Sequence, residues 1–465
     1  MQYLSTRGGI APVSFSEAVM MGLAEDGGLL LPRTIPRIGS ETLSAWLELS
    51  YQELALEVMS RFIDDIPRKE LQELIDRSYA TFDDEAVTPL VKKGDVYILE
   101  LWHGPTLAFK DVALQFLGNL FEYMLKKDDS VLNIIGATSG DTGSAAIAGV
   151  RGKDRINIFI LHPKGRVSPV QEKQMTTVMD DNIFNIAIEG SFDDGQAIVK
   201  EIFNDTEFKH QYHLGAINSI NWARVLAQVV YYVYSILQLM KKEKDFAVDF
   251  SIPTGNFGDI FAGYIARKML PQGTLHNLVL ATNSNDILSR MVQTGDYSLG
   301  KVKLTSSPSM DIQAASNFER YLFYLMDSDA VKTKNLMETF AAEGKIDLSG
   351  YMDQIKRDFA TASVSEEEVK ETISTFYKEN GYLLDPHTAV GVCAAAENRA
   401  AGVPIVCLAT AHPAKFPAVV EEACGEVPPQ PAQIDGLMEH ESKCVIMPAD
   451  KSEIQQYIAD HARKS

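Results

Sequence analysis

Lys110 lies on the apolar face of a predicted helix, where a charged side chain is not expected. The segment from Pro105 to Lys127 has a helical pattern. Steps of three, four, seven, eleven and fourteen residues from Lys110 reach Ala113, Leu114, Leu117, Phe121 and Met124. These positions share one helix face. Because burial and the positive end of the helix dipole both disfavour an ammonium group, we expect the pKa of Lys110 to be lowered. Such a lysine suits Schiff-base chemistry with a carbonyl cofactor.

Two glycine-rich loops each follow an apolar stretch and precede a helical one. Their sequences are IIGATSGDTGSAA at 134–146 and FSIPTGNFGDIFAGY at 250–264. A strand, a glycine turn and a helix start direct backbone N–H groups and a helix dipole at an anion. Neither loop matches the nucleoside triphosphatase or dinucleotide-binding pattern. A tight turn between strand and helix is the alternative interpretation of each loop.

The first loop carries hydroxyl groups and one acid. Thr138, Ser139 and Thr142 add hydrogen-bond donors that suit a carboxylate or a phosphate. Asp141 stands in a loop that favours anions, so we expect it to face a phenol, a hydroxyl or an amine. Capping of the following helix is its alternative role.

Further polar residues follow strand ends or precede a helix. Asn218, Ser219, Asn221 and Arg224 lie in the segment Ile217–Gln228, just before the apolar stretch Val229–Met240. This group of residues either binds a phosphate, with the Arg224 guanidinium making a two-pronged contact, or caps the helix beside a surface arginine.

Two more segments end buried strands. In His162–Ser168, Lys164 and Arg166 follow a strand end, which is where ligands bind in open α/β sheets. They either supply positive charge to a ligand site or are solvated turn residues. In Val406–Pro413, Thr410 is placed to meet a ring nitrogen, whereas His412 is expected to be structural, held extended before a proline.

The order of predicted elements indicates an α/β protein. Residues 1–95 are mostly helical in pattern, with apolar periodicity in Ser40–Phe62 and Glu70–Phe82. From residue 96 apolar strands alternate with helices, which indicates parallel sheets covered on both faces. The expected strands are Tyr97–Leu101, Val131–Gly136, Ile156–Leu161, Ile183–Ile188, Phe246–Ile252, Leu278–Ala281 and Ile405–Ala409. We expect three domains, 1–95, 96–215 and 216–465, with a charged helical insertion near 330–380.

Composition limits the classes of partner. The net charge of −20 argues against nucleic acid and anionic membranes, so an anionic ligand must meet a local cationic pocket. The four cysteines show no metal-binding or disulfide spacing, and we expect inert thiols and no metal. The first residues contain no apolar leader and no long apolar run occurs, so a cytoplasmic protein without a membrane partner is expected.

Four motifs occur together in an order known from one family. They are Trp102–Asp111 (WHGPTLAFKD), Ala137–Ser144 (ATSGDTGS), Pro253–Asp259 (PTGNFGD) and Ala409–Pro413 (ATAHP). With Tyr3–Gly8 and Ala24–Leu29 they closely resemble threonine synthases of the longer type found in many bacteria and in fungi. The resemblance extends from about residue 3 to 420.

The resemblance implies pyridoxal-phosphate fold type II, which is tryptophan synthase β-like, with two parallel-sheet α/β domains and a mostly helical N-terminal section. It implies a lyase that uses pyridoxal 5′-phosphate to convert O-phospho-L-homoserine and water to L-threonine and phosphate. A monomer or a homodimer is expected.

The resemblance also implies roles for individual residues. Lys110 is similar to the Schiff-base lysine, Asp141 stands where many relatives carry an asparagine near the ring hydroxyl, and Thr410 resembles the partner of the ring nitrogen. The cofactor-phosphate loop would be Gly255, Asn256, Phe257 and Gly258. Thr138, Ser139 and Thr142 would bind the substrate carboxylate, and Ser219 and Arg224 its phosphate. Asp259 departs from the expected asparagine, so its loop is expected to bind phosphate through backbone N–H groups.

Alternative functions are open at this point. Another lyase of the same fold, such as a serine/threonine dehydratase or a sulfhydrylase, would not need a second anion site. A non-catalytic protein that binds phosphometabolites on this scaffold, or a sugar-phosphate binding protein without cofactor, would not need Lys110.

Overall fold

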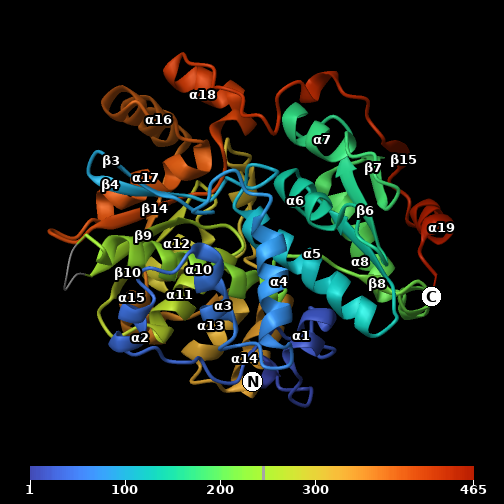
Figure 1. Ribbon diagram of the computed structural model, residues 1–465, viewed down its shortest axis with the longest axis horizontal. Coiled ribbons are helices and arrows are strands. Elements are labelled where there is room, and N and C mark those ends of the chain that lie inside the picture. Colours follow the sequence, from blue (N-terminus) through green and yellow to red (C-terminus); the bar gives the residue numbers. More distant parts are fainter. Residues whose placement is uncertain (243–246, 465) are drawn as a thin grey trace. The chain divides into compact units, whose positions relative to one another are not determined.

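The chain forms two compact units in its computed structural model, which describes residues 1–242 and 247–464 (Figure 1). Unit 1 contains Met1–Asp76, Phe82–His103 and Ser219–Pro428. Unit 2 contains Arg77–Thr81, Gly104–Asn218 and Pro429–Ser465. Each unit is built on its own sheet.

The sheet of unit 2 is entirely parallel. Its strand order is β15-β7-β6-β5-β8. The strands are β5 (Leu132–Ala137), β6 (Ile156–Pro163), β7 (Ile183–Glu189), β8 (Leu214–Gly215) and β15 (Val445–Pro448). Burial of β6 over its whole length explains why its sequence is a continuous apolar run with little alternation.

Helices cover this sheet. They are α5 (Lys110–Lys127), α6 (Asp141–Val150), α7 (Pro169–Thr176), α8 (Phe192–Asn204), α9 (Thr206–Gln211) and α19 (Lys451–His461). Ile198 and Ile202 of α8 and Ile454 and Ile458 of α19 share a core with Phe159 of β6. α6 packs against α5 and lies on β6, so the helix that carries Lys110 is fixed through α6.

The main sheet of unit 1 is mixed. Its order is β13-β10-β9-β14-β4-β3, in which only the β3–β4 pair is antiparallel. The strands are β3 (Leu90–Lys93), β4 (Val96–Glu100), β9 (Val248–Pro253), β10 (Leu275–Thr282), β13 (Ala360–Ser363) and β14 (Ile405–Ala409). Two small antiparallel pairs accompany it, β1 (Tyr3–Ser5) with β2 (Leu30–Pro32) and β11 (Asp296–Ser298) with β12 (Lys345–Asp347).

Helices pack on both faces of this sheet as well. Helices α16 (Glu366–Asn380), α17 (Pro386–Asn398) and α18 (Pro417–Cys424) share an apolar core with one face, and α10 (Trp222–Met240) packs on α11 (Gly258–Met269), which lies against β10. The other helices are α1 (Phe15–Met21), α2 (Ser40–Ala45), α3 (Tyr51–Met59), α12 (Ile287–Thr294), α13 (Phe318–Leu325), α14 (Ala330–Glu343) and α15 (Met352–Asp358). Helix α4 (Arg68–Tyr79) contains residues of both units.

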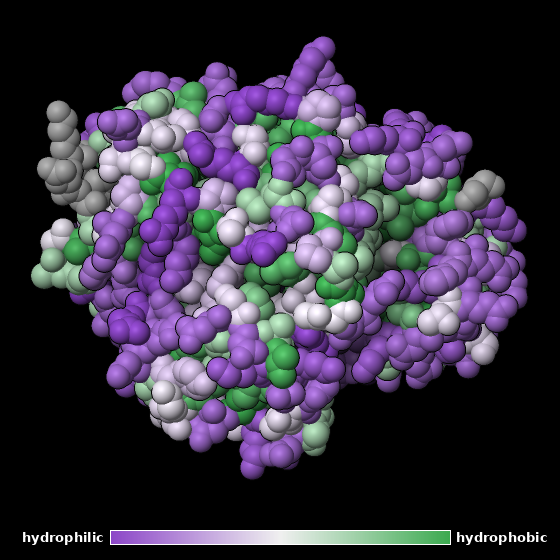
Figure 2. Space-filling model, turned by 90° about the horizontal axis from the view of Figure 1, so that it is seen from below, coloured by the Kyte–Doolittle hydropathy of each residue, from purple (hydrophilic) through white to green (hydrophobic). Residues whose placement is uncertain are grey.

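Helix α10 is the longest apolar helix. Among the described residues it alone is long and apolar enough to span a membrane, but 89% of that stretch is buried inside the protein. It is therefore a core helix of unit 1. The face drawn in Figure 2 is mostly hydrophilic with scattered apolar residues.

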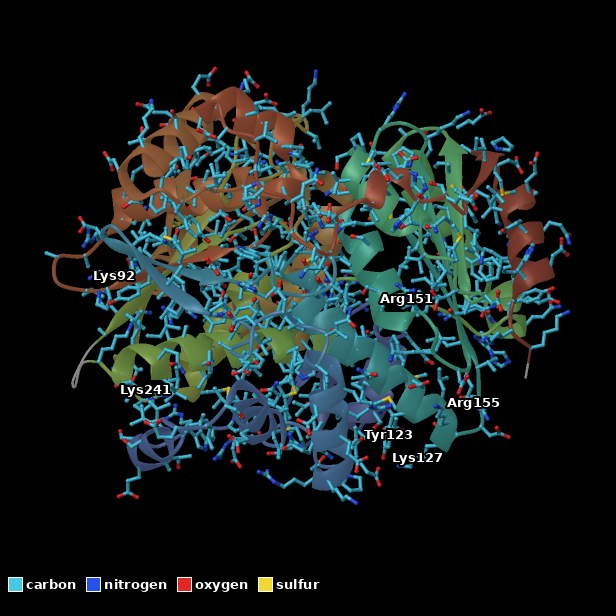
Figure 3. All side chains as sticks on the ribbon, turned by 45° about the horizontal axis from the view of Figure 1, so that its top comes forward. Lys92, Tyr123, Lys127, Arg151, Arg155 and Lys241 are labelled. Atoms are coloured by element: carbon cyan, nitrogen blue, oxygen red, sulfur yellow. The ribbon has the colours of Figure 1, made fainter. Side chains whose placement is uncertain are left out.

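The predicted strands are confirmed to within a few residues, although Phe246 lies outside the described residues. Several helix predictions are wrong in their bounds. Helix α5 begins at Lys110, because Pro105–Phe109 form a turn in which the backbone N–H and Oγ1 of Thr106 each donate to Asp111 at 2.8 Å. The pattern in Ser40–Phe62 is divided into α2 and α3, because Ser50 caps a new helix. Lys126 and Lys127 end α5 and are exposed. Lys127 is labelled in Figure 3.

The compact units differ from the predicted consecutive domains. Residues 429–465 belong to unit 2 because β15 pairs in parallel with β7. The predicted helical insertion near 330–380 also contains β13, which pairs with β10 at the edge of the main sheet. The three ranges stay a prediction about domains.

Close packing of α5 on α6 generates a stability prediction. A Cβ atom at Gly118 of α5 would lie 2.0 Å from the Gly149 carbonyl oxygen of α6, which is too close for any side chain. We expect Gly118→Ala to destabilise the protein by roughly 1–3 kcal/mol or more, because packed helices resist separation. Gly350→Ala, where nothing lies within 4 Å, is the control. Thermal midpoints that agree for both variants would refute this account.

Candidate active site

Lys110 is the first residue of α5 and its side chain is only 10% exposed. The predicted apolar face is confirmed, since Ala113, Leu114, Leu117, Phe121 and Met124 are all buried. Lys110 Nζ lies 3.4 Å from Asp141 Oδ2 and 5.0 Å from the centre of the Phe109 ring. The amine is thus held in a largely dry environment beside one carboxylate.

Asp141 links Lys110 to a third side chain. It is buried at the start of α6, and its Oδ1 accepts a hydrogen bond of 2.7 Å from Gln171 Nε2 of α7. It thus faces an amine, one of the partners predicted for it. Gly140 has φ +145°, and a Cβ there would lie 2.5 Å from Gln171, so this approach requires glycine. Gln171 belongs to no sequence motif and was not predicted as a site residue.

The three hydroxyls of the first loop differ in their surroundings. Thr138 Oγ1 accepts from the backbone N–H groups of Gly140 at 3.0 Å and Gly143 at 2.9 Å, so it shapes the loop. Ser139 is exposed and Thr142 is half-buried, and neither hydroxyl is hydrogen-bonded to a described residue. These two hydroxyls are available to a ligand.

The second loop, in unit 1, joins β9 to α11 and leaves donors free. Phe257 adopts φ +64° and packs against the rings of Phe318 and Phe359, while a Cβ at Gly255 would lie 2.6 Å from the Ser309 carbonyl oxygen. The backbone N–H groups of 255–258 make no hydrogen bond with the described residues. These N–H groups, at the start of α11, form a cradle of the kind that holds a phosphate.

The Asp259 side chain is directed away from this cradle, toward α10. Tyr232 donates to its Oδ1 at 2.9 Å, and Tyr231 donates to the same oxygen. Burial raises the pKa of Asp259 to about 6, and the two tyrosine hydrogen bonds oppose that rise. The carboxylate is therefore engaged by two tyrosines of α10, and phosphate binding through backbone N–H groups stays a prediction.

Arg224 lies in the first turn of α10, which begins at Trp222, earlier than the predicted apolar stretch at Val229. Its side chain is buried, and its Nε and Nη1 have no hydrogen-bond partner among the residues that the structure describes. Burial without a carboxylate lowers the pKa of Arg224 to about 10. Asn221 is the helix cap that the alternative interpretation predicted, but Arg224 is not a surface residue. A buried, unpaired guanidinium requires an anion.

Ser219 stands just before this helix and connects it with the second loop. Its Oγ lies 2.9 Å from Ser316 Oγ, which in turn donates to Asn256 Oδ1 at 3.2 Å. The predicted cofactor-phosphate loop and Ser219, one of the two predicted substrate-phosphate residues, are therefore linked through Ser316 in unit 1.

Other polar residues of unit 1 follow β14 and β4. Thr410 is buried at the end of β14, and its hydroxyl is hydrogen-bonded to no described residue. His412 is structural as predicted, since its Nδ1 accepts from the Ala414 N–H at 3.1 Å. Burial lowers the pKa of His412 to about 4. His103 contacts Asp83 at 2.6 Å and Glu100 at 2.9 Å; although burial opposes it, these bonds raise the pKa of His103.

The two cations that follow β6 are exposed. Lys164 forms an ion pair of 3.2 Å with Glu189, and Arg166 is solvated beside Asp194. Both fit the alternative interpretation as turn residues.

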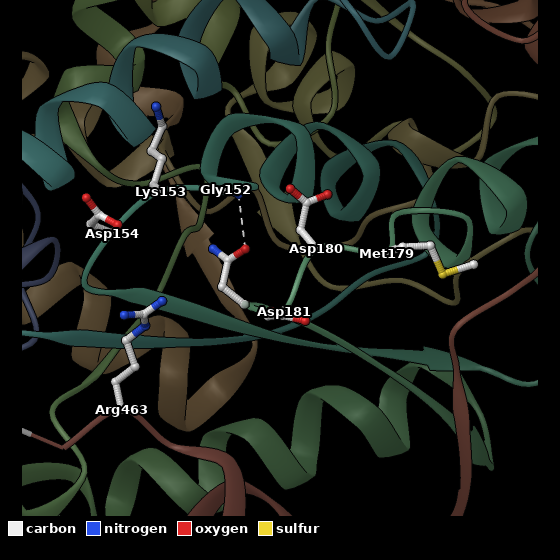
Figure 4. A pocket seen from close by; sticks show the side chains of 8 residues that line it. Gly152, Lys153, Asp154, Met179, Asp180, Asp181 and Arg463 are labelled. Carbon is white, nitrogen blue, oxygen red and sulfur yellow. Dashed lines mark hydrogen bonds between the residues drawn. The ribbon is translucent and has the colours of Figure 1, made fainter.

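Unit 2 also contains a polar hollow of about 380 Å³, away from the Thr138 loop (Figure 4). It lies where β6 and β7 begin, whereas the Thr138 loop follows the carboxyl end of β5. Its cations are already bound, Lys153 to Asn119 at 2.6 Å and Arg463 to Asn157 at 2.8 Å. The hollow is therefore separate from the candidate site.

Comparison with known proteins gives matches along the whole chain. Family models match residues 2–79 (threonine synthase N terminus), 82–410 (pyridoxal-phosphate dependent enzyme) and 388–458 (threonine synthase, C-terminal). The threonine synthase of Pseudomonas aeruginosa is 46% identical over 100% of this chain and 99% of its own.

Solved structures agree. The pyridoxal-phosphate-bound threonine synthase of Brucella melitensis matches with a TM-score of 0.96 and 44% identity over 100% of both chains. The threonine synthase of yeast matches with a TM-score of 0.94 and 43% identity over 99% of this chain and 98% of its own. The chain belongs to the threonine synthase family of pyridoxal-phosphate-dependent lyases, which have fold type II.

Proposed function

We propose that the protein converts O-phospho-L-homoserine and water to L-threonine and phosphate, the last step of threonine biosynthesis. The observation that carries this substrate is the buried Arg224 guanidinium, which has no anionic partner among the described residues. Arg224 lies in the first turn of the helix that follows Ser219, and Ser219 is linked through Ser316 to the loop 255–258. A substrate with its own phosphate supplies the missing charge. A lyase without a phosphate substrate would have no use for a second anion site.

The residues present fit pyridoxal 5′-phosphate. The free N–H groups of 255–258 would hold its phosphate, the Thr410 hydroxyl would meet its ring nitrogen, and Lys110 would join its aldehyde. Bound there, the cofactor stabilises negative charge on the substrate carbons next to the amine. Lys110 and the first loop belong to unit 2, and the remaining proposed residues belong to unit 1.

The chain's own residues then bind, orient and move protons. Ser139, Thr142 and the start of α6 bind the substrate carboxylate, while Thr138 keeps the loop in shape. Lys110 is the base that removes protons from the substrate carbons, and Asp141, held by Gln171, orients its amine. Arg224 and Ser219 hold the phosphate before and after the carbon–oxygen bond breaks. The phosphate so held is the base we propose for the incoming water.

Alternative reactions are distinguished by their products. A serine/threonine dehydratase releases ammonia, whereas the proposed reaction releases phosphate. Non-catalytic binding of a phosphometabolite would yield neither. We also propose a monomer or homodimer. A cytoplasmic location is in agreement with four free thiols, and burial raises the pKa of the Cys407 thiol to about 12.

Replacing Lys110 tests the covalent link to the cofactor. Lys110→Ala should abolish both threonine formation and the visible absorbance of the bound cofactor, because no other amine is proposed to join it. Lys153→Ala, which removes another lysine of unit 2, should keep both. Retained absorbance and turnover in Lys110→Ala would refute the assignment.

Replacing Arg224 separates binding from stability. Arg224→Met should raise the KM for O-phospho-L-homoserine on the order of a hundredfold, with a much smaller effect on cofactor affinity, because a desolvated contact to phosphate is lost. The thermal midpoint of the ligand-free protein should not fall, since an unpaired buried charge is removed. The control is Arg267→Met, which breaks a contact of 2.5 Å with Asp358 and should lower the midpoint without raising KM. Equal losses of substrate and cofactor would remove Arg224 from the substrate site.

Asp259 predicts a dependence of stability on pH. Its folded pKa is raised from 3.8 to about 6, so the folded state holds its proton more tightly than the unfolded state. The contribution of the protonated Asp259 carboxyl to the free energy of unfolding is therefore complete below the pKa of the unfolded state. It is lost as pH rises through the pKa of the folded state. Asp259→Asn should therefore gain thermal stability over the unsubstituted protein between about pH 4 and pH 7, without weaker cofactor binding. A stability difference independent of pH would contradict this.

A further inference from the structure

Ser316 and Asn317, just before α13, touch both of the proposed phosphate-binding segments of unit 1. One segment is the loop 255–258, and the other is Ser219 with the start of α10. Neither Ser316 nor Asn317 belongs to a motif that the sequence analysis identified. Their contacts nevertheless link the segments directly.

Asn317 is fully buried and uses its amide as a bridge. Its Nδ2 donates to the Ser219 carbonyl oxygen and to the Asn256 carbonyl oxygen, both at 3.2 Å. Its backbone N–H also donates to the Asn256 carbonyl oxygen, at 3.0 Å. A Cβ at Gly258 would lie 3.3 Å from Nδ2, so the loop packs closely on this amide. One side chain therefore holds the backbones of both segments.

Arg320, one turn further along, fixes the orientation of this amide. Its Nη1 donates to Asn317 Oδ1, which leaves Nδ2 facing the two carbonyl oxygens. Its other nitrogens donate to Leu30 O at 3.1 and 2.9 Å and to Ile220 O at 2.6 Å. Arg320 is fully buried, so it holds α13, β2 and the start of α10 at fixed positions.

The N-terminal segment anchors the same helix. Arg7 contacts both carboxylate oxygens of Glu319 at 2.9 Å, and Thr6 Oγ1 donates to Glu319 at 2.6 Å. The start of α13 is thus held from several directions before any ligand binds. Such preorganisation reduces the ordering that a ligand must otherwise induce.

The hydroxyl of Ser316 repeats the bridge at the surface. It lies between Ser219 Oγ at 2.9 Å and Asn256 Oδ1 at 3.2 Å, and it is exposed. Two bridges, one buried and one exposed, therefore join the same pair of segments.

We propose that Ser316 and Asn317 form a clamp that sets the separation between the cofactor-phosphate loop and the substrate-phosphate residues. They are positioning residues, and the proposal rests on the proposed function. Because one clamp holds both segments, its loss weakens cofactor and substrate together. By contrast, loss of Arg224 affects chiefly the substrate.

The test uses Asn317→Leu holoenzyme, in which the amide donors are removed without adding charge. We expect the dissociation constant of pyridoxal 5′-phosphate and the KM for O-phospho-L-homoserine each to rise on the order of tenfold, from two lost hydrogen bonds. We expect kcat to fall less than KM rises. Ser316→Ala, at an exposed position where folding is not at risk, should change both constants in the same direction by a smaller factor.

A matched control isolates positioning from stability. Asn182 of unit 2 is also buried, and its Nδ2 also donates to two carbonyl oxygens, those of Val150 at 2.9 Å and Ile156 at 3.0 Å. Asn182→Leu should lower the thermal midpoint and leave both constants unchanged. The clamp is refuted if Asn317→Leu and Ser316→Ala alter neither constant or only one, or if Asn182→Leu alters them equally.

Failure of the proposed function would be visible separately. If the unsubstituted holoenzyme releases no phosphate from O-phospho-L-homoserine, the function is wrong. The clamp is then tested by the cofactor dissociation constant and by calorimetric binding of inorganic phosphate, both of which should weaken in Asn317→Leu. Unchanged binding of both would overturn the clamp as well.

Discussion

A positive charge held inside unit 1 without a negative partner is the constraint on which the rest of the site depends. The protein as a whole is strongly acidic, with a net charge of −20, yet no carboxylate in 1–242 or 247–464 pairs with Arg224. Keeping a guanidinium dry and unpaired destabilises the ligand-free protein. The fold tolerates this cost because α10 is an almost fully buried helix whose other side chains supply a large apolar core.

Other polar groups proposed for the site also lack hydrogen-bond partners among the described residues. The N–H groups of 255–258 and the Thr410 hydroxyl make no hydrogen bond with the described residues, whereas most buried polar groups elsewhere are paired. Phe257 holds a left-handed conformation, which its aromatic neighbours fix by packing. Rigid packing outside the loop thus leaves the donors inside it free for an anion.

The structural role of the N-terminal segment follows from α13. Thr6 and Arg7 of the N-terminal segment have no catalytic role in our proposal. They are hydrogen-bonded to Glu319 of α13, which is adjacent to Arg320, the residue that orients Asn317. Sequence motifs far from the reacting atoms can therefore belong to the positioning of a site. In unit 2 the equivalent task falls to close helix contact, since α5 and α6 approach through Gly118 and Gly149 and bring Lys110 near Asp141.

Features that depend on local periodicity and on short motifs could be predicted from the amino-acid sequence. The apolar face of Lys110, the parallel strands and the two glycine loops follow from side-chain spacing and from the backbone freedom of glycine. Which distant residues meet could be learned only from the folded chain. The contacts of Gln171 with Asp141 and of Asn317 with Ser219 and Asn256 join segments that lie 30, 98 and 61 positions apart, and no local pattern encodes such pairs. Helix bounds also depend on such contacts, because the turn closed by Thr106 and Asp111 competes with apolar periodicity before the start of α5.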